Sequence, residues 1–202
     1  EMGSVAVALK EVIQFVRKPT LEDTVKTRVE FLTGYQDAAY AERYRSYVQK
    51  VQEAEMRLGP DRRLSEAVAR YLFKLMAYKD EYEVARLHTD PAFLAQLDAQ
   101  FKHGYTVKYN LAPPTISKKD PVTGHLIKQQ FGPWMRSAFG WLTRFKGLRG
   151  GSLDVFGKTE ERRQERQMID EYIKELDAIC ATLSPVNHAA AVALASVPDE
   201  IR

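Results

Sequence analysis

The stretch from Leu64 to Leu87 constrains the fold more than any other part of this sequence. At about 100° per residue, its apolar side chains fall on one face, which is typical of an amphipathic helix that packs into a core. The residues on this face are Leu64, Val68, Tyr71, Leu72, Leu75, Tyr78 and Tyr82. We therefore predict a mainly α fold, a helical bundle around a central helix over residues 64–87.

Helical periodicity also precedes and follows this stretch. Asp90 before Pro91 and Thr159 before a charged segment have the side chains that commonly cap helix N-termini. Before the central stretch we predict helices over 5–17 and over 20–58, the second with an interruption at Gly34. After it we predict a helix that begins at Asp90 and has an apolar face of Phe93, Leu94, Leu97 and Phe101. Three more helices follow: one opened by Gly132-Pro133-Trp134, one over 159–183, and one from Ser184 to Val197.

One segment changes to the two-residue alternation of a strand. From Tyr105 to Leu111 apolar and polar side chains alternate, and Pro113-Pro114 ends the run. Turn-forming residues follow at 120–124, and the chain can return as a partner strand up to Phe131. We predict one β-hairpin at about 105–131, as an appendage to the helices.

Length and charge limit the classes of protein to consider. With 202 residues, the chain suits a single helical domain over residues 5–202, large enough to bury a core without metals or disulfides. Residues 1–4, Glu-Met-Gly-Ser, resemble a tag remnant, so they stay outside the fold reasoning. The net charge of the whole chain is +3, from 30 basic and 27 acidic residues. Such a near balance disfavours a dedicated nucleic-acid or membrane-surface protein.

The cysteine content and the lengths of the apolar runs bear on where in the cell the protein is located. Cys180 is the single cysteine, so the chain can form no internal disulfide, iron–sulfur cluster or multi-cysteine zinc site. We expect Cys180 to lie in the core. No apolar run reaches the roughly 18 residues of a membrane span, and no secretory signal is recognisable. We therefore expect a cytoplasmic protein with no membrane partner.

Two cations interrupt the apolar face of the central stretch. Lys79 and Arg86 fall on the stripe, among the carboxylates of Asp80, Glu81 and Glu83. A cation in a helix–helix seam needs a partner, because desolvating it alone costs several kcal/mol. The cluster can bind an external anion, or it can be an internal ion-pair network. The second interpretation is favoured, since structural ion pairs commonly produce such patterns.

A second basic cluster lies in the glycine-rich loop from Arg144 to Gly151. Its candidate anion or interface contacts are Arg144, Lys146 and Arg149, because backbone N–H groups of such loops can bind a phosphate or carboxylate. The phosphate-binding pattern GxxxxGK[ST] is absent. The alternative, which is favoured, is a connector in which glycine ends a helix.

No recognisable catalytic or metal motif accompanies these clusters. His88, His103, His125 and His188 lack metal-ligand spacing, and no nucleophile motif is present, so we name no catalytic residue and no metal site. The hairpin lysines can contact nucleic acid together with Tyr105 and Tyr109, but a solvated face is favoured. These lysines are Lys102, Lys108, Lys118, Lys119 and Lys128.

Several long segments resemble one family. They are FLTGYQDAAYAERY (31–44), AVARYLFKLMAYKDEYEVARLHTDP (67–91), FGPWM (131–135), FKGLRGGSLDVFG (145–157) and LSPVNHAAAVALASVPDEIR (183–202). Together they resemble the C-terminal extension, itself without an assigned role, of the large single-chain indolepyruvate ferredoxin oxidoreductases of bacteria. The resemblance covers about residues 24–202.

The resemblance implies a set of partners and cofactors for a longer enzyme. Such enzymes oxidise aryl 2-oxoacids with thiamine diphosphate, magnesium and iron–sulfur clusters, and pass the electrons to ferredoxin. It implies catalytic domains of the same polypeptide as partners, together with ferredoxin or a second subunit. No thiamine motif is recognisable here and one cysteine cannot hold a cluster, so we expect no cofactor in this segment.

Two functions follow as hypotheses from different classes. The first is an accessory domain of the oxidoreductase that packs on or bridges its catalytic domains and carries no chemistry itself. The second is a free-standing binding or interaction module that contacts nucleic acid through the basic hairpin. Salt-dependent retention of DNA or RNA would support the second, since phosphate contacts weaken steeply with salt.

Overall fold

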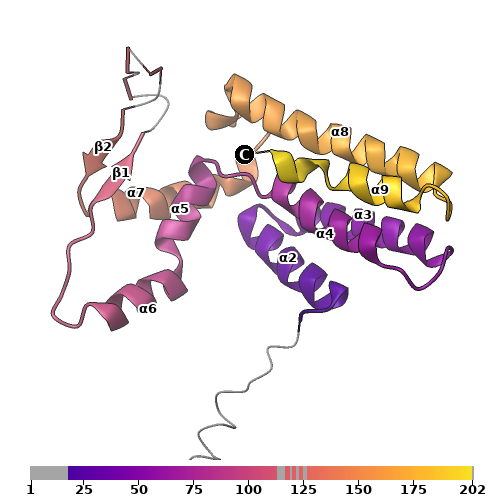
Figure 1. Ribbon diagram of the computed structural model, residues 1–202. Coiled ribbons are helices and arrows are strands. Elements are labelled where there is room, and N and C mark those ends of the chain that lie inside the picture. The colour runs from indigo at the N-terminus through magenta and orange to yellow at the C-terminus, as the bar shows by residue number, and fades with distance from the viewer. Residues whose placement is uncertain (1–17, 113–116, 119, 122, 125–126, 202) are drawn as a thin grey trace, which may run out of the picture.

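The computed structural model describes residues 18–112, 117–118, 120–121, 123–124 and 127–201. Within them the fold is mainly helical with one short two-stranded antiparallel sheet, so the predicted fold class is confirmed. In Figure 1 a group of long helices lies on one side, and a group of shorter helices with the hairpin lies on the other. The helix predicted at 5–17 lies outside the described residues.

The first helices of the bundle begin at local capping residues. Helix α2 (Leu21–Tyr35) starts after Thr20, whose hydroxyl accepts a hydrogen bond from the Asp23 N–H while Asp23 bonds back to Thr20. This reciprocal pair is a capping box. Helix α3 (Ala38–Met56) starts after Asp37. The predicted interruption at Gly34 is therefore confirmed, since the chain breaks within two residues of it.

The prediction of one central helix over 64–87 is wrong in its continuity. The stretch forms two helices, α4 (Arg63–Met76) and α5 (Glu81–Thr89), separated at residues 77–80. The second helix begins where it does because the Asp80 carboxylate accepts the Glu83 N–H at 2.8 Å and acts as N-cap. The prediction of the buried face is confirmed, since each of the seven residues on the stripe is buried, at 8% exposure or less.

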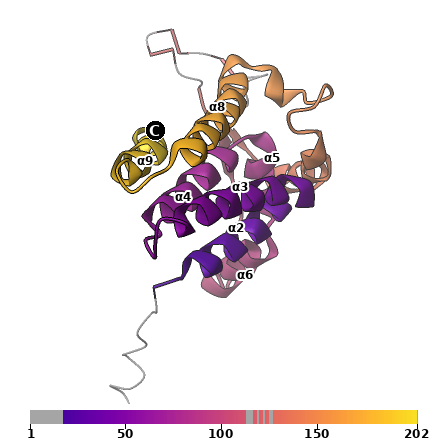
Figure 2. The same cartoon turned by 90° about the vertical axis from the view of Figure 1, so that its right-hand side faces the viewer.

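Two C-terminal helices complete the bundle (Figure 2). Helix α8 (Glu160–Thr182) starts after the predicted cap Thr159 and packs against α3 and α4. Helix α9 (His188–Ala195) begins later than predicted, because the Asn187 side chain first ties the connection together by bonding Ser184 N–H and the Thr182 carbonyl. The 3₁₀ turn η3 (Val197–Glu200) follows.

The second group begins at α5 and carries the hairpin. It contains α6 (Pro91–Gln100), the strands β1 (Tyr109–Leu111) and β2 (Gln129–Phe131), α7 (Met135–Leu142), and the 3₁₀ turns η1 (Thr143–Leu148) and η2 (Phe156–Lys158). The predicted hairpin at 105–131 is confirmed, with an antiparallel ladder that pairs Tyr109 with Phe131 and Leu111 with Gln129.

The buried apolar side chains form two clusters that correspond to these groups. The larger one joins α2, α3, α4, α8 and α9, with Tyr35, Tyr44, Leu72 and Leu176 among its most buried members. The smaller one joins α5, β1 and α7 around Ala85, Tyr109, Met135 and Phe139. The junction between α4 and α5 therefore lies where one cluster gives way to the other.

Candidate functional site

The junction is organised by a buried ion pair between Asp80 and Arg149. Arg149 Nε and one terminal nitrogen donate to the two carboxylate oxygens at 2.5 and 2.9 Å. The side chains of Arg149 and Asp80 are only 2% and 4% exposed. The predicted loop cation Arg149 thus binds a carboxylate, and that carboxylate belongs to the same chain.

Further contacts surround the Arg149 guanidinium. It donates to the Tyr35 carbonyl at 2.6 Å and lies 3.7 Å from the centroid of the Tyr35 ring. Burial alone would lower the pKa of Arg149, but the hydrogen bonds and charge of Asp80 outweigh burial and raise it. Burial also raises the pKa of the Tyr35 hydroxyl, which donates to the Tyr78 carbonyl. The residues around Arg149 therefore hold it charged and leave Tyr35 neutral.

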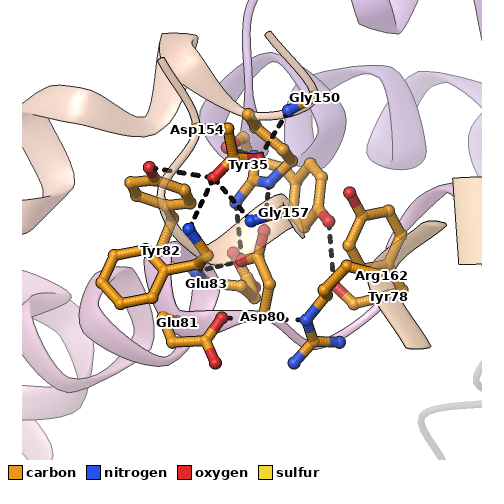
Figure 3. A network of polar contacts seen from close by, with 12 residues as sticks. Tyr35, Tyr78, Asp80, Glu81, Tyr82, Glu83, Gly150, Asp154, Gly157 and Arg162 are labelled. Carbon is orange, nitrogen blue, oxygen red and sulfur yellow. Dashed lines mark hydrogen bonds and ion pairs between the residues drawn. The ribbon is translucent and has the colours of Figure 1, made fainter. Parts of the chain in front are cut away.

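Asp154 holds the loop that carries Arg149, and Figure 3 shows its carboxylate between Gly150, Gly157 and Tyr82. Its carboxylate accepts the N–H groups of Gly150, Phe156 and Gly157 at 2.7 to 3.1 Å. The Tyr82 hydroxyl lies 3.3 Å from the same carboxylate; burial, and then Asp154, raise the pKa of Tyr82 to about 12. The loop is thus closed around a buried carboxylate, and its N–H groups are not free to bind an external anion.

The two cations predicted on the central stripe have different surroundings. Arg86 pairs with Glu83 through two hydrogen bonds of 2.7 and 2.8 Å, and its guanidinium lies over the Phe31 ring of α2. Lys79 is exposed, and within the described part of the chain no carboxylate pairs with it. The structure therefore places Arg86 in an internal ion pair and leaves Lys79 available.

The remaining loop cations also differ from each other. Lys146 donates to the carbonyls of Gly34 and Thr33 at 2.6 and 3.3 Å, which satisfies the C-terminal end of α2. Arg144 is exposed. The three predicted loop residues are thus not assembled around one common point.

A second polar cluster caps α4 from a distance. Glu55 is 1% exposed and accepts the N–H groups of Leu64 and Ser65, together with the Ser65 hydroxyl. His188 Nε2 lies 2.7 Å from the same carboxylate. Burial raises the pKa of Glu55, but these hydrogen bonds outweigh it, so the pKa lies below its ordinary value. Glu55 thus replaces the missing local cap of α4.

Glu55, Asp61 and His188 bring ligand atoms within 4.8 Å of one another, as a metal site would. However, the Glu55 oxygens are already engaged as described, and those of Asp61 accept from Arg63. The geometry is that of a satisfied capping cluster. The iron–sulfur clusters implied by the resemblance do not fit this chain either, because Cys180 is alone and lies half-buried against the helical core.

A pocket of about 260 Å³ opens beside the junction. Its lining combines apolar side chains of α5, β1, α7 and η2 with the charged residues Lys79, Asp80, Glu81 and Arg162. Burial raises the pKa of Glu81, whose Oε2 atom is buried without a hydrogen bond and lies 3.7 Å from Arg162 Nε. The predicted residue Lys79 thus borders a cavity.

Four of the five hairpin lysines fall within the described residues, and these four lie on the surface. Lys102, Lys108, Lys118 and Lys128 are exposed, while Lys119 and His125 lie outside the described residues. The Tyr105 hydroxyl donates to Asp98 at 2.6 Å, and Tyr109 is buried in the smaller cluster. Burial of Tyr109 keeps its ring from stacking on a base, whereas the Tyr105 side chain is 37% exposed.

Sequence reasoning missed the roles of Asp80, Asp154 and Glu55. Asp80 is followed three residues later by Glu83, a spacing that marks helix N-termini and would have shown the break. Asp154 stands among Gly150, Gly151 and Gly157, where an acidic side chain commonly accepts loop N–H groups. No local signal identifies Glu55, because it caps a helix nine residues further along the chain.

Comparison with known proteins places the chain in a family without assigning an activity. The model of a family of unknown function, DUF6537, matches residues 21–202. No curated protein matches the chain, and no solved structure matches it either.

None of the described helices combines the length and the apolar character needed to cross a membrane.

Proposed function

The chain belongs to the family of unknown function DUF6537, and with no assigned activity to inherit, we propose that it is a helical accessory domain of an indolepyruvate-type 2-oxoacid ferredoxin oxidoreductase. In this role it packs on the catalytic domains, and those domains supply the thiamine diphosphate, magnesium and iron–sulfur chemistry. The resemblance of segments across residues 24–202 supports the identity of the enzyme. The proposal includes a cytoplasmic location, as the single cysteine suggests.

The observation that carries the packing role is the exposure of helix α6. None of its residues is buried, although five of its ten positions are alanine or leucine and Asp98 is its one charged residue. The Phe93 and Phe101 side chains are 38% and 47% exposed. In Figure 1 this helix projects from the end of α5, away from the bundle.

An exposed apolar helix of this length needs a covering partner. An isolated helix shorter than about 12 residues is marginal in water, and tertiary packing normally supplies its stability. Within the described residues, α5 is the one element with which α6 makes substantial contact. We infer that the predicted apolar face of α6 is the surface that packs on the catalytic domains.

The internal contacts of the junction support the absence of chemistry in this domain. Arg149, Asp80, Asp154 and Arg86 are each engaged in ion pairs or hydrogen bonds that position helices and loops. Buried ion pairs of this kind commonly have a structural role. A positioning and assembly role accounts for these contacts.

Hydrogen–deuterium exchange tests the packing role. The amides of residues 91–101 should exchange at least about tenfold more slowly in the intact oxidoreductase than in the 202-residue chain alone. Replacing Phe93 and Leu97 by Ser should lower the melting temperature of the intact enzyme and leave that of the chain alone little changed. Ala95→Ser, on the opposite side of α6, is the matched control.

Two results would contradict the proposal. Equal exchange of residues 91–101 in both forms would show that nothing covers α6 in the enzyme. Turnover of a 2-oxoacid by the purified chain alone would show that the domain carries the chemistry itself.

A further inference from the structure

The pocket beside the junction has the shape and lining of a small-molecule site. Its apolar walls come from four elements and consist of Val84, Leu111, Met135, Phe139, Leu142 and Phe156. At about 260 Å³ it lies just below the roughly 300–1,000 Å³ that drug-sized ligands occupy. Its occupant is therefore a compact molecule with an apolar body.

The charges at the edge of the pocket narrow the class of ligand. Lys79 is exposed and, among the residues that the structure describes, has no carboxylate partner. Arg162 is already engaged, at 2.7 Å by Glu165 and at 3.7 Å by Glu81. Lys79 is thus the cation at this edge that is free to meet an anionic group of a ligand.

The Glu81 carboxylate is the group at this pocket that would repel an anionic ligand. Arg162, which also pairs with Glu165, lies 3.7 Å from Glu81 Oε2 and partly offsets its charge. Burial also raises the pKa of Glu81, so its charged form is less favoured than that of a surface glutamate. Asp80, which also borders the pocket, is neutralised by Arg149 from the other side. The ammonium of Lys79 is therefore the exposed cation lining this pocket that no described carboxylate pairs with.

We propose that this pocket binds a small carboxylate with an aromatic or branched aliphatic body, and that Lys79 pairs with the carboxylate. The apolar walls contact the body, and the ammonium of Lys79 forms a charge-assisted hydrogen bond at the solvent edge. An apolar compartment with a few convergent polar groups is the usual arrangement of such sites.

Titration of the 202-residue chain with 3-phenylpropanoate, followed by NMR chemical shifts, tests the proposal. We expect saturable shifts at Val84, Ala138 and Leu142, and at least about tenfold weaker binding to Lys79→Met. The uncharged analogue 3-phenylpropan-1-ol should bind the unmodified chain more weakly by a similar factor. Lys174→Met, which removes an exposed lysine from the surface of α8, should bind as the unmodified chain does.

A pocket-filling variant gives a second measurement. Ala138→Phe places a ring in the cavity and should abolish the shifts, with its folding checked by circular dichroism. Because Lys79 is exposed, Lys79→Met folds normally and keeps the test decisive even where Ala138→Phe does not fold. The proposal would be overturned if 3-phenylpropanoate showed no saturable binding. It would also be overturned if Lys79→Met bound 3-phenylpropanoate as tightly as the unmodified chain does, or if the unmodified chain bound the alcohol as tightly as the carboxylate.

Discussion

Arg149 and Asp80 stand 69 positions apart in the chain and form a two-point ion pair that is almost completely buried. The same Asp80 carboxylate caps α5, so the pair connects the start of this helix to the loop after η1. Arg149 also bonds the Tyr35 carbonyl at the end of α2. One guanidinium thus fixes the position of the smaller cluster relative to the helical bundle.

Removing one partner of this pair should strongly destabilise the fold. Asp80→Asn leaves Arg149 as an uncompensated buried charge, and Arg149→Met does the same to Asp80, so we expect a loss of about 3–5 kcal/mol in the free energy of unfolding. Urea denaturation measures it. Arg163→Met, which removes an exposed ion pair with Glu160, should change stability little. A loss of stability in Arg163→Met as large as that in Asp80→Asn or Arg149→Met would contradict a special role for the buried pair.

The capping role of Glu55 predicts a local effect on α4. Glu55→Gln replaces an acceptor oxygen by an NH₂ group that cannot accept from the N–H groups of Leu64 or Ser65. We expect a loss of about 1–3 kcal/mol, with faster hydrogen exchange in the first turn of α4. The control is Glu53→Gln at an exposed position of α3, which should leave that exchange unchanged.

Gly157 predicts a steric effect on the loop around Asp154. A Cβ atom added at this position would lie 2.1 Å from an Asp154 carboxylate oxygen, far inside van der Waals contact. Gly157→Ala should therefore displace Asp154 and lower the melting temperature. Gly140→Ala lies in α7 with open space around it and should stabilise the protein by about 0.5–1 kcal/mol. Unchanged stability of Gly157→Ala would show that the loop adapts without cost.

His88 predicts a pH dependence of the smaller cluster. Its ring stacks on Phe139 and meets Tyr109 edge to face, and burial, followed by the charge of Lys79, lowers its pKa below the ordinary 6.5. The folded form then binds the proton less tightly than the unfolded form. The stabilising contribution of the neutral ring is therefore present above pH 6.5 and lost as the pH falls through the folded pKa.

Thermal melts of the protein and of His88→Phe between about pH 7.5 and pH 5, a range that spans the ordinary histidine pKa, measure this contribution. The variant should lose part of the decline in melting temperature at low pH. His103→Gln, which removes an exposed histidine, should keep the full decline. Identical pH profiles for the protein and His88→Phe would contradict the prediction.

Local patterns in the sequence predicted the parts of the fold that depend on neighbours in the chain. The caps Thr20, Asp90 and Thr159 act within three residues, and each begins a helix as expected. The buried face of the central stretch was predicted because helical spacing alone determines which side chains share a face. These features need no knowledge of the rest of the molecule.

The parts that were not predicted depend on distant partners. Seven apolar positions in register indicated one continuous helix, yet the N-cap Asp80 interrupts it and is fixed by Arg149 from another loop. The apolar face of α6 looked like a core-facing surface, and its exposure follows from the course of the chain after α5. The separate environments of Lys79 and Arg86 depend likewise on Phe31 and on the pocket.

The contacts of Arg149 also set an order of events during synthesis. While the ribosome is still making the segment before residue 149, Asp80 has already emerged without its counter-ion, and the last turn of α2 lacks both Lys146 and Arg149. The connection between the two clusters can therefore form only once residue 149 has been translated and has emerged, a long-range closure of the kind that slows folding.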